Sequence, residues 1–376
     1  MSKLFKGISE IIVCYDNDDA GQNGAKEICR SVGAKAKKIN WEPDRAKSYD
    51  LNDLFLECGS KNEFLKEIER YARTAKAEVE AILKPSASLL DLFKDRVALE
   101  SKNEIIGISS GYSRFDRQFS GMSGIILVGG IPKGGKTTFV GNIAIRTAEQ
   151  GYATIYMDYE NGPLNLLGKI HTNIFHRTIG EIRKDYKDIF DPSKHKPEHA
   201  RLLKILNNLY FIRPSARDVN DAFASAQEIS TQILERYTAY LRDDLAYTKP
   251  ILFIIDSLQK LPVLNTNDKR SSIDGWLRSF EYIRDQYNVT FLIVSELARG
   301  KYNKPALEMF KESGDIEYTA DLALFLENQD PVINLQTVAN RNGEIGEPIV
   351  YMADFKHWKL NEMDDYSIRK KLKNEK

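Results

Sequence analysis

The chain has 376 residues, with 54 basic against 54 acidic side chains and an ordinary 42% of hydrophobic residues. This length favours two or three domains, and the composition supports a sizeable core and argues against disorder. The balanced charge excludes the overall basic coat of histone-like proteins, although local Lys and Arg in a pore or groove could still bind nucleic acid.

The sequence indicates a cytoplasmic protein with no membrane contact. No apolar run approaches the roughly 20 residues that span a bilayer, and the N-terminus lacks the apolar core of a signal peptide. The three cysteines, Cys14, Cys29 and Cys58, form no CxxC pair and have no close His partner. We therefore expect neither a zinc site nor a disulfide framework, and a reducing cytosol.

The first two regions are short. Residues 1–57 have the pattern strand, acidic loop, helix and strand, beginning with IIVCY and continuing through AKEICRSVGA. Residues 58–104 are charged with helical periodicity, and KPSAS separates two helical stretches. This second region is expected to be a helical linker.

Residues 105–360 alternate apolar strands with amphipathic helices, and residues 361–376 form a charged tail. The expected strands are IILVGG, ATIYMDY, LYFIRP, ILFIID, TFLIVS, LALFLE, INLQTVA and IVYMAD. Long helical segments separate the first four, which predicts an α/β fold with a mostly parallel sheet between layers of helices. The closely spaced last strands predict antiparallel hairpins at one edge.

The strongest motif is GGIPKGGKTTFV at 129–140, which fits G-x-x-x-x-G-K-[ST] between a strand and a helix. Glycines allow backbone N–H groups to surround phosphate oxygens, and the helix N-terminus favours anions. Lys136 is expected to reach the β- and γ-phosphates of ATP, and Thr137 to ligate Mg²⁺. The expected nucleotide-binding residues are Gly130, Ile131, Pro132, Lys133, Gly134, Gly135, Lys136, Thr137 and Thr138.

Two acidic positions complete this predicted site. Asp256 ends the apolar strand PILFIID and is placed to hold Mg²⁺ through water. Hydrolysis also needs a base that orients water. In many proteins with such a phosphate loop a glutamate directly follows the metal-binding aspartate, but here Ser257 follows it. We therefore expect Glu160, after the strand ATIYMDY, to be the base. Asp158 is the alternative.

Residues 105–360 resemble the RecA-like replicative hexameric helicases, of the DnaB type and of the phage primase-helicase type. The resemblance lies in GISSGYSRFDRQFSGMSG before the phosphate loop, ESGDIEYTADLALFLE at 312–327 and ANRNGEIGE at 339–347. In that family the arginine of the last segment enters the neighbouring subunit's ATP site, and Arg341 matches it. Such fingers raise the rate about 10³–10⁵-fold.

Two positions depart from the family pattern. Ala339 stands where the family usually has Lys, and Glu296 stands where relatives have Gln or His that senses the γ-phosphate. An ionised glutamate cannot donate that hydrogen bond. Either departure could weaken the coupling between ATP and DNA.

The resemblance also implies that loops after the later strands face a central channel. Two such loops are basic, and sequence-independent contacts to a DNA backbone fit them. The possible DNA-binding residues are Lys260, Lys269, Arg270, Arg299, Lys301 and Lys304.

Asp16, Asp18 and Asp19, in YDNDDAG, resemble the second half of a TOPRIM domain, in which carboxylates share Mg²⁺. That family also needs a glutamate on an earlier strand, and Glu10 lies in the wrong place for it. No zinc module for primer synthesis is present. We therefore expect no primase activity, and we interpret this partial TOPRIM-like segment as a relic or a docking element.

Together these features predict an ATP-dependent DNA helicase that moves along single-stranded DNA as a homo-oligomeric ring, as a hexamer in the family. A primase or another replication protein is a further expected partner. The alternatives are a RecA-like regulatory or recombination ATPase without unwinding, and a nucleotide-binding replication scaffold. Glu296 and Ala339 keep the scaffold open.

Overall fold

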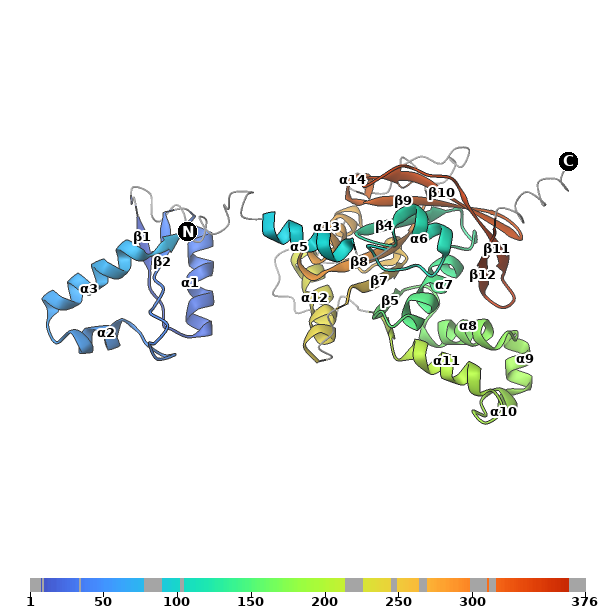
Figure 1. Cartoon of the computed structure of the whole chain (residues 1–376), viewed down its shortest axis with the longest axis horizontal. Helices are drawn as coiled ribbons and strands as arrows, with labels where there is room; N and C mark the ends of the chain where they lie inside the picture. Colours follow the sequence, from blue (N-terminus) through green and yellow to red (C-terminus); the bar gives the residue numbers. More distant parts are fainter. Residues whose placement is uncertain are drawn as a thin grey trace. The chain divides into compact units, whose positions relative to one another are not determined.

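A computed structural model describes residues 8, 10–33, 35–77, 90–101, 105–213, 226–244, 249–263, 269–297, 310 and 316–364. The chain divides into two compact units, Met1–Ser101 and Lys102–Lys376 (Figure 1). Each unit has its own sheet and its own buried clusters. No helix within the described ranges is long and apolar enough to cross a membrane.

The N-terminal unit is built on a three-stranded sheet in the order β1-β2-β3, with β1 parallel to β2 and β3 antiparallel to it. Its elements are β1 (Ile11–Val13), α1 (Asp19–Val32), β2 (Ala36–Lys38), α2 (Leu51–Cys58), α3 (Lys61–Thr74), β3 (Lys76–Ala77) and α5 (Leu90–Glu100). Side-chain caps begin three of the helices: Asp18 for α1, Asp50 for α2 and Ser60 for α3. The expected strand, helix and strand of residues 1–57 are all present.

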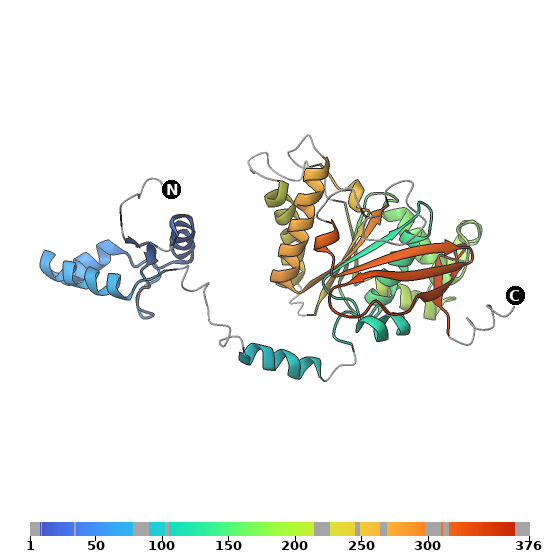
Figure 2. The ribbon, with the colours of Figure 1, turned by 90° about the horizontal axis from the view of Figure 1, so that it is seen from above.

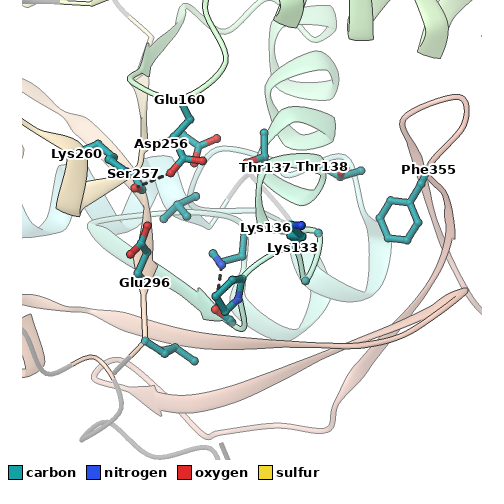
Figure 3. A pocket seen from close by; sticks show the side chains of 16 residues that line it. Lys133, Lys136, Thr137, Thr138, Glu160, Asp256, Ser257, Lys260, Glu296 and Phe355 are labelled. Atoms are coloured by element: carbon teal, nitrogen blue, oxygen red, sulfur yellow. Dashed lines mark hydrogen bonds between the residues drawn. The ribbon is translucent and has the colours of Figure 1, made fainter. Parts of the chain in front are cut away.

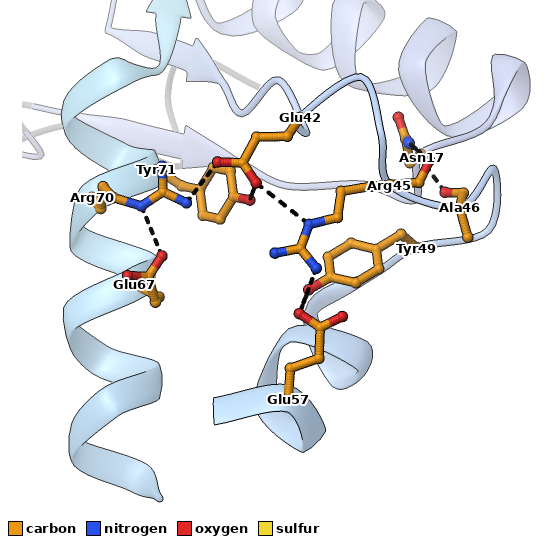
Figure 4. Close-up of polar contacts among 9 residues, drawn as sticks. All are labelled: Asn17, Glu42, Arg45, Ala46, Tyr49, Glu57, Glu67, Arg70 and Tyr71. Carbon is orange, nitrogen blue, oxygen red and sulfur yellow. Dashed lines mark hydrogen bonds and ion pairs between the residues drawn. The ribbon is translucent and has the colours of Figure 1, made fainter. Parts of the chain in front are cut away.

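The packing of this unit extends beyond residue 57, where the sequence places the start of a linker. Tyr71 of α3 is buried against Trp41, with ring centroids 5.1 Å apart. Glu42 accepts hydrogen bonds from Arg70 at 3.0 Å and from the Tyr71 hydroxyl at 3.1 Å (Figure 4). Helix α3 and strand β3 therefore belong to the folded unit. Strand β3 pairs with β2, and the amphipathic helix α3 buries its apolar face against this unit.

The C-terminal unit is built on a nine-stranded sheet in the order β12-β11-β10-β9-β4-β8-β7-β5-β6. The six strands from β9 to β6 run parallel, and β10, β11 and β12 add antiparallel hairpins at one edge. The strands are β4 (Ile125–Gly130), β5 (Thr154–Asp158), β6 (Leu209–Ile212), β7 (Ile251–Asp256), β8 (Val289–Glu296), β9 (Leu322–Gln329), β10 (Val332–Asn340), β11 (Ile349–Asp354) and β12 (Lys359–Glu362).

Helices cover both faces of this sheet, so its central strands are apolar on both sides. In β4, Ile126 and Val128 pack with α7 (Lys136–Glu149), whereas Ile125 and Leu127 pack with α12 (Ala226–Asp244) and α13 (Lys269–Tyr287). Figures 1 and 2 show α12 and α13 together on one side of the sheet. The remaining helical elements are α6 (Ser113–Phe119), α8 (Pro163–Phe175), α9 (Ile179–Lys184), α10 (Tyr186–Ile189), α11 (Lys196–Leu206), η3 (Leu258–Lys260) and α14 (Ile316–Thr319).

The predicted α/β class is confirmed, and all eight expected strands form. Strand β12 was not predicted. It has four residues, KLNE, of which only Leu360 is apolar and fully buried. The segment therefore lacks the alternating apolar pattern that predicts a strand.

Candidate nucleotide-binding site

The phosphate loop connects the end of β4 to the start of α7. Gly135 has φ +92°, and Lys133 has φ +61°. A side chain at Gly135 would be strained by that φ and would meet Ile333 at 3.1 Å, so glycine is required there. The Lys136 ammonium donates to the carbonyls of Gly130 at 2.9 Å and Ile131 at 3.0 Å, which holds it inside the loop.

The loop borders a cavity of about 920 Å³. Every predicted loop residue except Ile131 lines it. Figure 3 shows Glu160, Asp256 and Ser257 on one side, Phe355 on the other, and the loop between them. The lining residues are Gly130, Pro132, Lys133, Gly134, Gly135, Lys136, Thr137, Thr138, Glu160, Asp256, Ser257, Lys260, Val294, Glu296, Leu297 and Phe355.

Asp256 is buried at the end of β7, with 1% exposure. Burial raises the pKa of Asp256 to about 6, against hydrogen bonds from Tyr156 and Thr137 that lower it, and nearby Glu160 and Asp158 raise it further. The Tyr156 hydroxyl donates to Asp256 at 2.9 Å. A buried carboxylate beside other carboxylates favours a cation, and Mg²⁺ takes oxygen ligands. The Asp256 carboxylate and the Thr137 hydroxyl therefore fit that ion.

The two alternative bases have different surroundings. Asp158 is buried and accepts hydrogen bonds from the backbone N–H groups of Asn161, at 3.0 Å, and Gly162, so it caps its own loop. Glu160 lines the cavity, and the Ser257 hydroxyl donates to it at 3.4 Å. Of the two, only Glu160 lines the cavity.

Glu296 also reaches this cavity, from the end of β8. Its backbone N–H donates to Gln259 at 2.8 Å. Burial lowers the pKa of Lys136, and the negative charges of Glu296, Asp256 and Glu160 oppose that shift. The glutamate thus adds negative charge near the loop lysine, which the family's Gln or His would not.

Arg341 lies at the other end of the strands. It bonds to Asp321 at 2.9 Å, and the Asp321 carboxylate accepts from the N–H of Ile125 at 2.9 Å. Ile125 begins β4, whereas Gly130 ends it at the phosphate loop. Five residue steps of a strand span roughly 16 Å. Arg341 is therefore remote from the nucleotide cavity of the same chain.

The structure describes three of the six predicted DNA-binding residues. Lys260 lines the nucleotide cavity, and Lys269 and Arg270 begin α13. Arg299, Lys301 and Lys304 lie outside the described residues. Lys260 is thus close enough to take part in nucleotide binding.

Sequence reasoning missed Phe355 as a lining residue. It lies in the turn between β11 and β12, and the nearest atom of its ring is 3.4 Å from the Cβ position of Gly135. The turn is far from the phosphate loop in sequence, so no motif marks it. The only signal in the sequence was the presence of a large aromatic residue in a tight turn. In the structure, the Phe355 side chain is 40% exposed.

The acidic loop of the N-terminal unit has structural partners. Asp18 caps α1 by accepting from the N–H of Gly21 at 2.6 Å, and Glu10 pairs with Lys37 at 2.6 Å. Among the described residues, Asp16, Asp18 and Asp19 are not part of a group of three converging metal ligands. The TOPRIM-like interpretation stays a prediction.

Comparison with known proteins gives the family of the C-terminal unit. Residues 107–358 match the family model of the DnaB-like helicase C-terminal domain. The chain belongs to this family. The matched segment contains the phosphate loop, Asp256 and Arg341, so the expected resemblance is confirmed over most of the C-terminal unit.

Named relatives of this DnaB-like chain are replicative helicases. It is 26% identical over 291 residues to a "Probable replicative DNA helicase" of Trieres chinensis, covering 69% of this chain and 59% of the relative. It is 24% identical over 255 residues to "Replicative DNA helicase DnaB" of Rickettsia typhi, covering 62% and 47%. The chain thus spans about half the length of the curated relatives it matches.

Solved structures show the same RecA-like fold. One of them, described as an ATPase domain, has a TM-score of 0.60 at 18% identity, covering 74% of this chain and 98% of that one. A second neighbour, "The Structure Of A DnaB-Like Replicative Helicase And Its Interactions With Primase", has a TM-score of 0.59 at 16% identity, covering 83% and 75%.

Proposed function

We propose that the chain is an ATP-hydrolysing DNA helicase motor that moves along single-stranded DNA during replication. The cavity carries this proposal: it joins the phosphate loop to Glu160 and Asp256, the groups that nucleotide hydrolysis requires. Membership of the DnaB-like family and the names of its relatives support the same activity.

Each side chain then has a defined task. Lys136 would exchange its carbonyl partners for the β- and γ-phosphate oxygens of ATP, and Thr137 and Asp256 would hold Mg²⁺. When bound, Mg²⁺ neutralises charge on the phosphates. Glu160 orients a water molecule and accepts its proton, and Ser257 positions Glu160 through their hydrogen bond. Phe355 offers an aromatic face to the nucleotide base.

Oligomerisation is part of this proposal, and the position of Arg341 supports it. If Arg341 acts on ATP, an arginine roughly 16 Å from the phosphate loop of its own chain must do so in a neighbour's site. We propose a ring, hexameric as in the family resemblance, with Lys269 and Arg270 contacting the DNA backbone. A primase is a proposed partner, because one structural neighbour is described with its primase interactions.

The first test measures ATP hydrolysis by the purified chain with and without single-stranded DNA, with Lys136→Ala as the blank. Strong stimulation that the substitution abolishes, followed by displacement of a labelled strand, supports the motor. Hydrolysis indifferent to DNA indicates a regulatory ATPase instead, and absence of hydrolysis at any protein concentration indicates a scaffold.

The assignment of the base is tested separately. Glu160→Gln keeps the shape of the side chain, so nucleotide binding should persist while turnover falls about 10²–10⁴-fold. Asp158→Asn is the matched comparison and should mainly lower stability, because Asp158 caps a loop. Retained turnover in Glu160→Gln with loss in the folded Asp158→Asn variant would reverse the assignment.

A further inference from the structure

All five histidines of the chain lie in the C-terminal unit, on α8, on α11, next to the ends of these helices, or in the β11–β12 turn. Four have an oxygen partner within their own segment: His171 with the Leu167 carbonyl, His195 with the Asp188 carboxylate, His199 with the Ile189 carbonyl and His357 with the Asp354 carboxylate. His176 comes from a distant segment and faces His357, with ring centroids 4.0 Å apart. Local packing therefore accounts for the partners of four rings, but not for the approach of His176 to His357.

A carboxylate completes the group. The Asp354 carboxylate lies 2.6 Å from Nδ1 of His357. One ligand atom from each of His176, Asp354 and His357 lies within 4.8 Å of the others. Within the part of the chain that the structure describes, no hydrogen bond is made by the ring of His176. Its nitrogen lone pair is thus available to a ligand.

The two segments that carry these residues are already held together. The Trp358 carbonyl accepts hydrogen bonds from Asn142 of α7 at 3.0 Å and from Asn173 of α8 at 2.8 Å. His176 ends α8 with φ +50°, a conformation uncommon for any residue but glycine. Such backbone outliers concentrate at functional sites, and preorganised ligands bind metals best when they stand on rigid elements.

We propose that His176, Asp354 and His357 form a binding site for a divalent transition metal ion of the zinc class. Two imidazoles and one carboxylate are a ligand set that Zn²⁺ uses, with water in the fourth position. Zinc ligands at about 2.0–2.2 Å lie roughly 3.4 Å from one another, so small side-chain rotations would close the site. Mg²⁺ prefers oxygen ligands alone, so this site differs from that of the nucleotide's ion.

The site is placed to join two parts of the motor domain. A bound ion ties the C-terminal end of α8 to the turn between β11 and β12. The same turn carries Phe355 into the nucleotide cavity. The ion therefore stabilises the turn that presents this aromatic ring.

The test is calorimetric titration of the full chain, freed of metal by chelation, with Zn²⁺. We expect one equivalent whose affinity falls by more than about 100-fold in His176→Asn and in Asp354→Asn, since even outer-shell partners contribute 10–100-fold. His195→Asn is the matched control, because its ring pairs with Asp188 elsewhere on the same unit, and it should bind Zn²⁺ as the natural chain does.

Co²⁺ distinguishes this site from the cysteines of the N-terminal unit. Nitrogen and oxygen ligands produce weak visible bands only, whereas a thiolate adds a charge-transfer band. His176 is exposed, so its substitution should leave the circular dichroism spectrum unchanged. Zinc affinity unaltered in His176→Asn, a thiolate band, or no Zn²⁺ uptake by the folded natural chain would each overturn the proposal.

Discussion

Arg341 and Asp321 form an ion pair of 2.9 Å at the end of the sheet opposite the phosphate loop. The Arg341 side chain remains 49% exposed, and its backbone N–H also donates to the Asp321 carbonyl at 2.8 Å. The pair thus fixes the start of the Arg-Asn-Gly turn while leaving part of the guanidinium exposed. This arrangement permits a direct test of whether Arg341 acts in the ATP site of a neighbouring chain.

Arg341→Ala should lower ATP turnover about 10³–10⁵-fold while nucleotide binding persists, because the guanidinium is needed only as charge develops on the phosphoryl group. Mixing this variant with Lys136→Ala should restore part of the activity. In a mixed ring, some sites combine an intact phosphate loop with an intact arginine from the neighbour. Turnover of the mixture is measured against each variant alone.

Arg284→Ala is the control for this experiment. Arg284 binds the same Asp321 carboxylate at 3.1 Å but is only 22% exposed, so it tests the ion-pair network without the finger. It should affect stability more than turnover. If the mixture stays inactive although both variants assemble, or if Arg284→Ala loses turnover equally while folded, the finger assignment is wrong.

Phe355→Ala should weaken binding of ATP roughly 5–150-fold, which corresponds to the 1–3 kcal/mol typical of a base stacked on an aromatic ring. Calorimetry with ATP and with inorganic tripolyphosphate separates the two contributions. Tripolyphosphate has no base, so its affinity should be equal in the natural chain and the variant. Equal loss for both ligands would show that Phe355 supports the phosphate loop instead.

The raised pKa of Asp256 predicts a pH dependence of stability. A folded pKa of about 6 against an ordinary 3.8 means that the unfolded chain binds fewer protons between these values. The contribution of Asp256 to the free energy of unfolding, without nucleotide, should therefore be greatest below pH 4. It should fall as the pH rises through 6, by about 3 kcal/mol at most. The thermal midpoint across this range measures the effect.

Asp256→Asn, which mimics the protonated carboxyl, should flatten that slope. In the natural chain, Mg²⁺ with ADP should raise the midpoint more at pH 7.5 than at pH 5, because the ion binds the ionised carboxylate. If the thermal midpoint depends on pH in the same way in Asp256→Asn, then other groups cause that dependence.

The sequence predicted the sheet and the phosphate loop because both are local patterns. Continuous apolar runs such as IILVGG and ILFIID occur where strands are buried on both faces. Glu160 and Asp256 were found because they directly follow such runs, at the edge where parallel strands end. These inferences require only the neighbours of each residue in the chain.

The remaining features depend on contacts between distant segments. Phe355 reaches Gly135 across more than two hundred residues, and His176 meets His357 across about 180 residues. The packing of the N-terminal unit beyond residue 57 has the same origin, since Tyr71 is buried in a cluster that includes Trp41. No periodic pattern in the sequence indicates such contacts.

Two glycines in helices should respond to Ala in opposite directions. A Cβ at Gly141 of α7 would lie 2.2 Å from the Trp358 ring, whereas at Gly180 of α9 the nearest atom is the Thr178 hydroxyl at 3.9 Å. Gly180→Ala should stabilise by roughly 0.5–1 kcal/mol through helix propensity. Gly141→Ala should destabilise by about 1–3 kcal/mol, because Trp358 is buried against α7 and cannot yield freely.

Scanning calorimetry of the two variants and the natural chain checks this sign reversal. Because the Trp358 carbonyl is bonded to Asn142 and Asn173, movement of its ring would also displace the turn that holds Phe355. Gly141→Ala should therefore lower both the ATP affinity and the unfolding temperature, whereas Gly180→Ala should lower neither. Stabilisation by Gly141→Ala would mean that the turn moves away from α7 without loss, and would contradict its rigid attachment to that helix.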